Sequence, residues 1–94
     1  MRCPRLSEAQ REILIMLHLG WHWGADRRSV RGLRLRGLVH LLPHTINHGS
    51  HVARFDLPHL TEAGRPLAAR LWLETPAEQK QAVRAVFLQW GLAS

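Results

Sequence analysis

Five arginines lie within ten residues of this 94-residue chain, at Arg27, Arg28, Arg31, Arg34 and Arg36. An arginine guanidinium is planar, always charged and able to donate two parallel hydrogen bonds to a phosphate or to the edge of a guanine. The cluster therefore predicts base-edge contacts from Arg28 and Arg31, and phosphate contacts from Arg27, Arg34 and Arg36. A solvated face on an arginine-rich protein is the alternative that the sequence leaves open.

A helix over residues 27–37 must present these arginines, with Asp26 or Ser29 as its cap. At 100° per residue, Val30, Leu33 and Gly37 fall on one side and Arg28, Arg31 and Leu35 on the other. The first side is expected to face the core, and the second to be solvated or bound. Leu35 is an apolar residue at the centre of the basic face, which suits either a thymine methyl or a protein-binding hot spot.

After Val39 the apolar period changes to two, and Asn47-His48-Gly49-Ser50 marks a hairpin tip. The sequence predicts a hairpin over residues 39–57 with Gly49 and Ser50 as a two-residue turn. In that register His48 pairs with His51, Ile46 with Ala53, His44 with Phe55, and Leu42 with Leu57. The core-facing side would carry Leu42, Ile46, Ala53, Phe55 and Leu57, and the other side Thr45, Arg54 and Asp56. Arg54 on the outer side of the hairpin and His48 and His51 at its tip are basic residues, and they are further candidates for nucleic-acid contact.

Three more helices are expected. Ser7-Glu8-Ala9-Gln10 has the pattern of a capping box and begins a helix over residues 8–19. Thr61 is expected to cap a helix over residues 61–73, in which Pro66 removes an amide donor. Thr75-Pro76-Ala77-Glu78 predicts a last helix over residues 76–90. The apolar side of that helix should be buried against the first helix or in a homodimer; it carries Val83, Val86, Phe87 and Trp90.

Two short motifs in this order resemble the winged-helix family over residues 6–73. The first has the form L-x-x-R-G-L-V, at Leu33, Arg36, Gly37, Leu38 and Val39; the second has the form L-T-x-A-G-R, at Leu60, Thr61, Ala63, Gly64 and Arg65. The resemblance implies an α+β, mostly helical fold, with a three-helix core and a β-hairpin wing, here followed by a C-terminal helix. It also implies that residues 27–37 form a DNA recognition helix.

The family pattern has a further helix between the first helix and the recognition helix, and only about seven residues separate Gly20 from Ser29. That second helix is predicted to be shortened or missing, which changes how the recognition helix would dock on DNA. Trp21 and Trp23 are expected to pack into the gap it leaves, with nucleic-acid or protein contact as the alternative.

Two histidine spacings, His18/His22 and His44/His48/His51, could bring imidazoles to one metal ion. Zinc prefers four ligands, and the one cysteine, Cys3, is remote from them, so unligated surface histidines are the favoured interpretation. Neither a catalytic triad, a carboxylate pair nor a phosphate-binding glycine loop is recognisable. The sequence therefore predicts a protein that is not an enzyme and has no cofactor.

The chain carries a formal net charge of +6, and twelve of its thirteen basic residues are arginine. Its single cysteine excludes an internal disulfide, and neither a signal peptide nor a membrane-spanning run is recognisable, so a cytoplasmic protein is expected. A chain this short buries a limited core, which makes a homodimer plausible on size.

These features predict a single-domain, DNA-binding transcriptional regulator from a bacterium, phage or mobile element, with double-stranded DNA as its partner. The alternative is a phage or mobile-element effector, similar to an anti-CRISPR, that uses the same scaffold to bind and inhibit a host protein or nucleoprotein complex. The basic helix favours the regulator. The missing helix and Leu35 favour the effector.

Overall fold

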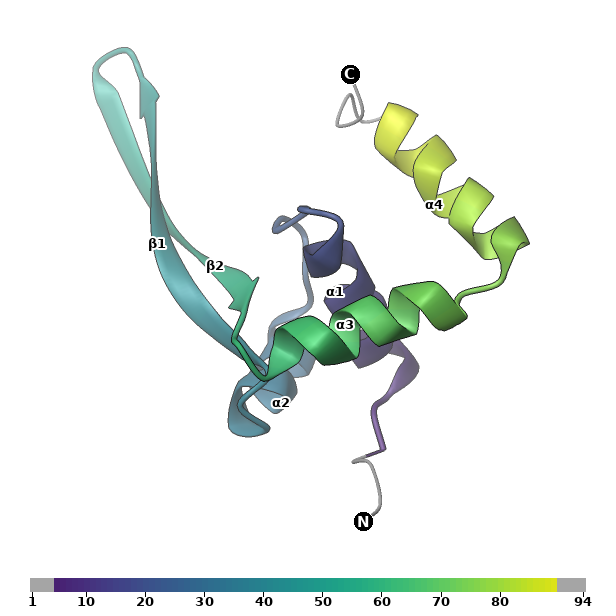
Figure 1. Cartoon of the computed structure of the whole chain (residues 1–94). Coiled ribbons are helices and arrows are strands. Elements are labelled where there is room, and N and C mark those ends of the chain that lie inside the picture. Colours follow the sequence, from purple (N-terminus) through teal and green to yellow (C-terminus); the bar gives the residue numbers. More distant parts are fainter. Residues whose placement is uncertain (1–4, 90–94) are drawn as a thin grey trace.

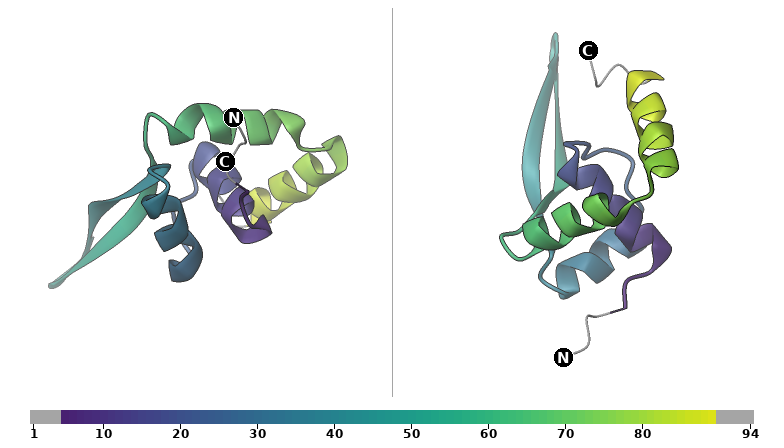
Figure 2. Two further views of the ribbon diagram at one scale, coloured as in Figure 1. Left: turned by 90° about the horizontal axis from the view of Figure 1, so that it is seen from below. Right: turned by 45° about the vertical axis from the view of Figure 1, so that its right-hand side comes forward.

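The computed structural model describes residues 5–89 and shows an α+β fold (Figure 1). The elements in chain order are α1 (Glu8–His18), α2 (Arg27–Leu35), β1 (Val39–His48), β2 (His51–Leu60), α3 (Gly64–Glu74) and α4 (Ala77–Gln89). The two strands form one antiparallel hairpin, which projects from the helices at the end of α3 opposite α4 (Figures 1 and 2). No helix in this part of the chain is long and apolar enough to cross a membrane.

The core surrounds α1, whose capping box is formed as predicted. The Gln10 amide donates to Ser7 Oγ at 3.1 Å, and the Ser7 amide donates to Gln10 Oε1 at 3.0 Å. Leu14 of α1 and Leu33 of α2 are fully buried. Seven further buried residues complete the cluster: Ile13, Leu17, Val30, Leu38, Val39, Ala68 and Leu71. Burial of each large apolar side chain contributes about 1.5–3 kcal/mol, so α1, α2 and α3 stabilise one another.

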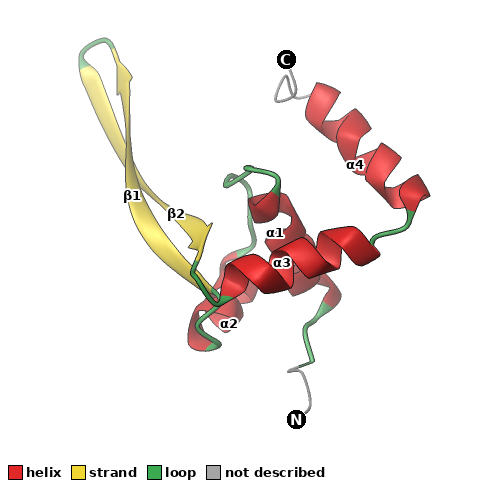
Figure 3. Cartoon of the chain, viewed as in Figure 1, coloured by secondary structure: helices red, strands yellow, loops and turns green. Residues whose placement is uncertain are grey.

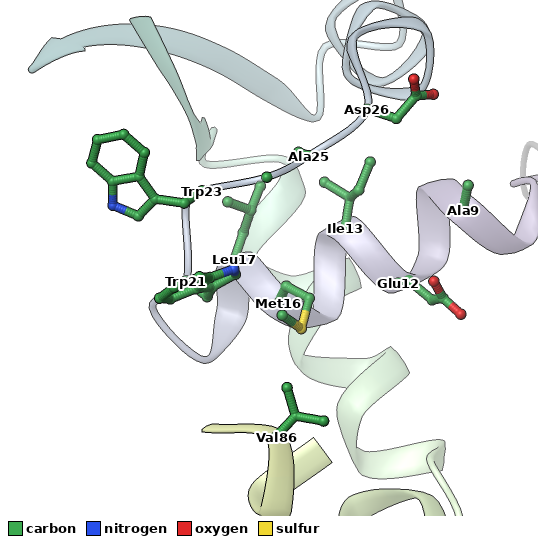
Figure 4. A pocket seen from close by; sticks show the side chains of 11 residues that line it. Ala9, Glu12, Ile13, Met16, Leu17, Trp21, Trp23, Ala25, Asp26 and Val86 are labelled. Atoms are coloured by element: carbon green, nitrogen blue, oxygen red, sulfur yellow. The ribbon is translucent and has the colours of Figure 1, made fainter. Parts of the chain in front are cut away.

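Residues 19–26 contain no helix, as the short spacing between α1 and α2 predicted (Figure 3). The half-buried Trp21 and the more exposed Trp23 line a hollow of about 680 Å³ beside Ile13 and Met16 of α1 (Figure 4). Trp23 turns toward the hairpin, where its ring meets the ring of Phe55 edge-on at 5.5 Å between centroids. The loop after α1 therefore packs partly on α1 and partly on the hairpin.

Helix α2 ends at Leu35, two residues before the predicted end at 37, because the chain turns at Gly37. The φ angle of Gly37 is +73°, a backbone conformation that glycine adopts without strain. The Leu38 amide donates to the Leu33 carbonyl, and the Gly37 amide donates to the Arg34 carbonyl, each at 3.0 Å. This is a Schellman motif, and it leads the chain directly into β1.

The hairpin has the predicted register, with His48 opposite His51 and Leu42 opposite Leu57, and Gly49 in the turn has a φ of +61°. It continues to Leu60 rather than ending at residue 57. The predicted core-facing side is wrong for most of its length. Leu42 and Phe55 are 40% and 42% exposed, Ile46 and Ala53 are half-buried, and Leu57 alone of the five is buried.

The physical reason is that the hairpin leaves the helices soon after its base, so its outer part has no core to face (Figure 1). At the base, the opposite face from Leu42 and Phe55 carries most of the packing: Val39 is buried, and Leu41 and Leu60 are half-buried against the core.

Helix α3 begins at Gly64 and not at residue 61, and its N-cap is Ala63 rather than Thr61. Because strand pairing extends to Leu60, Thr61 instead joins three elements. Its hydroxyl donates to the Gly37 carbonyl at 2.6 Å and accepts from the Gly64 amide at 3.1 Å, while its own amide donates to the Leu38 carbonyl at 3.1 Å. Pro66 lies in the first turn of the helix, where the missing donor costs little.

Position 64 must be glycine because the fold leaves no room there for a side chain. A Cβ atom at this position would collide with the carbonyl oxygen of Leu38. The end of α2, the base of the hairpin and the start of α3 therefore meet through backbone contacts at Gly37, Leu38, Thr61 and Gly64, which we call the backbone junction.

Helix α4 spans Ala77–Gln89, close to the predicted 76–90. Lys80 places its ammonium 5.3 Å from the centre of the half-buried Trp72 ring, a cation–π contact between α4 and α3. Val86 lies across the hollow from α1 and is 43% exposed, so its expected burial against α1 is wrong for the single chain (Figure 4). The side chains of Phe87 and Trp90 lie outside the described residues, and a homodimer through this helix stays a prediction.

Candidate nucleic-acid interface

The first turn of α2 is fixed by Asp26, the N-cap residue. Asp26 Oδ2 accepts from the Ser29 amide at 3.1 Å and from the Ser29 hydroxyl at 2.9 Å. These hydrogen bonds, with a smaller contribution from the charge of Arg28, hold the pKa of Asp26 below its usual value. A carboxylate at this end also offsets the partial positive charge of the helix N-terminus. Of the two predicted capping residues, Asp26 is therefore the cap, and Ser29 is buried beneath it.

Four of the predicted arginines line one groove between α2 and the hairpin. Arg27, Arg31 and Arg34 follow one another at the i, i+4, i+7 spacing of one helix face, and Arg54 of β2 joins them from across the groove. The groove has a volume of about 720 Å³ and includes Leu41, Phe55, Leu57 and Pro58 in its lining. Asp56 is the one carboxylate among the described residues that line it. The lining is therefore strongly basic.

The remaining arginines of the cluster lie elsewhere on α2. Arg28 is exposed and is absent from the groove lining, and Leu35 is 80% exposed. Arg28 and Leu35 are seven residues apart, so they lie on the same, outward face of α2. Arg36 is the C-cap residue, and its guanidinium donates to the Arg5 carbonyl at 3.0 Å. One of its donors is therefore engaged with the segment before α1.

His48 and His51 form the last pair of the hairpin and are exposed at its tip, which projects away from α2 (Figure 1). The structure therefore separates these two candidates from the arginine groove. A ligand would have to be long to contact both.

The predicted histidine spacings do not converge on a metal position. Within residues 5–89, no group of three or more potential ligands is arranged to hold a metal ion. The hairpin instead brings His44 against His59, with their Nε2 atoms 2.7 Å apart. The sequence analysis missed this pair because it ended the hairpin at residue 57. Continuing the same register to residue 59 would have placed His59 opposite His40, on the face that also carries His44.

Sequence reasoning also missed the contribution of Trp23 and Phe55 to the arginine groove. The register carried no signal for it, because Arg54 and Phe55 are consecutive in β2 and point to opposite faces of the hairpin. No protein-family model, curated protein or solved structure matches this chain.

Proposed function

We propose that this protein is a winged-helix regulator of transcription that binds duplex DNA, with α2 as the recognition helix and the hairpin as the wing. The single observation that supports this most is the groove in which Arg27, Arg31, Arg34 and Arg54 lie together. Guanidinium groups from two elements, spread along one surface, suit a row of phosphates better than a single small anion.

The outward face of α2 supplies the second part of the proposal. Arg28 would point toward base edges when the groove arginines, Arg31 among them, hold the backbone, and Leu35 would meet a thymine methyl. The lack of a helix between α1 and α2 leaves one positioning contact fewer than a complete helix-turn-helix has. Modest sequence specificity with a strong electrostatic component is the expected behaviour.

The proposal is tested by titrating the protein against a random duplex at several salt concentrations. If four phosphates are neutralised, the log–log slope of affinity against salt should be about −3.6, so that affinity falls roughly 100-fold between 50 and 200 mM salt. A slope near zero, or no binding at the lowest salt, would contradict the proposal.

A second candidate function, binding and inhibition of a host protein, is favoured by one observation. Leu35 is 80% exposed on a helix surface and is flanked by arginines. An apolar side chain ringed by arginine is typical of an interface hot spot, where truncation costs about 2 kcal/mol or more.

The variant Leu35→Ala separates the two functions. As a DNA-binding helix, α2 should lose at most a methyl contact, and duplex affinity should change less than tenfold. As a protein-binding helix, it should lose about 30-fold in partner affinity, measured on a protein captured from nuclease-treated host lysate. Leu73→Ala is the matched control, because Leu73 is 75% exposed on α3, and it should change neither affinity.

A further inference from the structure

Four histidines from three segments gather on the face of the hairpin turned toward α1 and α3. His22 comes from the loop after α1, His40 and His44 from β1, and His59 from β2. The His22 ring stacks on the His59 ring with centroids 4.0 Å apart. The His44 and His59 rings are nearly parallel, at 9°, with centroids 4.9 Å apart. The loop and both strands are therefore connected through imidazoles.

Hydrogen bonds restrict the protons that these rings can carry. The Nε2 atoms of His44 and His59 are 2.7 Å apart, so one must donate and the other must accept with a bare nitrogen. His22 Nδ1 lies 2.8 Å from the Pro58 carbonyl oxygen. Because a carbonyl only accepts, His22 must carry its proton on Nδ1 and donate to Pro58.

The surroundings oppose additional positive charge. The hollow of about 720 Å³ beside His59 is lined by His18 of α1, His22 of the loop, His40 of β1 and Arg65 of α3, and its described lining includes no carboxylate. Burial, followed by the positive charges that His22, His44 and His40 can carry, lowers the pKa of His59 below 6.5. His59 is therefore the ring that stays neutral and accepts.

The cluster can hold one added proton across the His44–His59 pair but not two. A proton on Nδ1 of His44 turns the neutral hydrogen bond into a charge-assisted one, with His59 still accepting. A second proton must occupy Nε2 of His59. It removes the acceptor, breaks the bond and leaves two facing cations, with His22 stacked on one of them.

We propose that His22, His44 and His59 form a proton-sensitive latch, which holds the loop over residues 20–26 against the hairpin when His59 is neutral and releases it when His59 is protonated. The latch does not depend on what the arginine groove binds. Because the loop ends at Asp26, the cap of α2, release frees the segment that connects α1 to α2.

The sign of the pH effect follows from the lowered pKa of His59. Above pH 6.5, His59 is neutral in the folded and unfolded chains alike, and the closed state is fully stable. As pH falls through 6.5 the unfolded or released form binds the proton first, so closure weakens progressively until pH passes below the lowered value. Opening is therefore expected in mild acid, with the helical core intact.

The test is an NMR titration of the full chain from pH 7.5 to 5. The edge-on contact between the Trp23 and Phe55 rings reports a closed loop, since it joins the loop to β2. Its nuclear Overhauser effect should be present at pH 7.5 and lost at pH 5, in step with the titration of His59, while amide signals of Leu14 and Leu33 stay in place.

Two variants isolate the cause. His59→Phe keeps a ring for His22 to stack on and loses the hydrogen bond to His44 at every pH, but it cannot be protonated, so the Trp23–Phe55 contact should be the same at pH 7.5 and pH 5. His44→Gln can hydrogen-bond His59 without carrying charge and should move the opening midpoint to lower pH. The matched control His51→Phe, at the exposed hairpin tip, should open as the parent does. A contact that survives at pH 5 in the parent, or opening of both the His59→Phe and His44→Gln variants at the parent's midpoint, would overturn the latch.

Discussion

Replacing Arg27, Arg31, Arg34 and Arg54 together by alanine should reduce affinity for duplex DNA at least 100-fold at low salt and bring the salt slope close to zero. These residues share one groove, so their removal takes away the surface on which a phosphate row would lie. Each lost phosphate contact removes about 0.9 from the slope. The measurement is the salt-series titration with parent and variant side by side.

The control variant has the same net charge as the groove variant but loses its arginines from other parts of the surface. Arg5, Arg11, Arg70 and Arg84 are also exposed, and their joint replacement by alanine removes the same four positive charges from surfaces outside the groove. This second variant should keep most of the affinity and most of the slope. If both variants lose binding equally, the net charge of +6 and not the groove governs DNA binding.

Gly64→Ala should destabilise the protein strongly, although it adds only one methyl group. An added Cβ would collide with the Leu38 carbonyl oxygen, a backbone atom that cannot rotate away, so α3 or the hairpin base must shift. We expect a loss of about 3 kcal/mol, at the upper end for overpacking, and a fall of the melting temperature by roughly 12–24 °C. The direction is opposite to helix propensity, which favours alanine over glycine by about 1 kcal/mol.

Gly32→Ala is the matched control, because Gly32 is also a helical glycine. Its added Cβ would meet only the side-chain amide of the half-buried Gln10, which can rotate away at most at the cost of its capping-box hydrogen bond to Ser7. We expect this variant to melt within a few degrees of the parent. Thermal unfolding followed by circular dichroism compares the three proteins, and equal melting temperatures for parent and Gly64→Ala would show that the junction can relax.

The features that local rules determine were predictable from the sequence. The capping box at Ser7, the absence of a helix before Asp26 and the hairpin register all depend on residues close in the chain. The register was predictable because glycine at a two-residue turn fixes every pair back to the base. The exposure of the α2 arginines was predictable because an α-helix repeats every 3.6 residues, so the spacing in the sequence decides which residues share a face.

Features that depend on distant parts of the chain were not predictable in this way. Alternation in the hairpin identified which residues share a face, but whether a core lies opposite that face depends on where the hairpin leaves the helices. Phe55 and Leu42 are exposed for that reason. Threonine is a residue type that commonly caps helices. Because strand pairing extends to Leu60, however, Thr61 lies at the backbone junction and hydrogen-bonds Gly37 and Leu38. The convergence of Arg54 on α2 depends on the same hairpin direction.

The backbone junction also has a mechanical consequence for the hairpin. β1 begins at the backbone junction and β2 ends there, and each strand has ten residues. At about 3.4 Å per residue the hairpin is a lever roughly 30 Å long, so a tilt of about 5° at its base moves the tip by about 3 Å. That displacement is about the length of a hydrogen bond. A small change in packing around Leu38 and Gly64 would therefore move His48 and His51 far enough to decide whether a hydrogen bond to a bound partner could form at the tip.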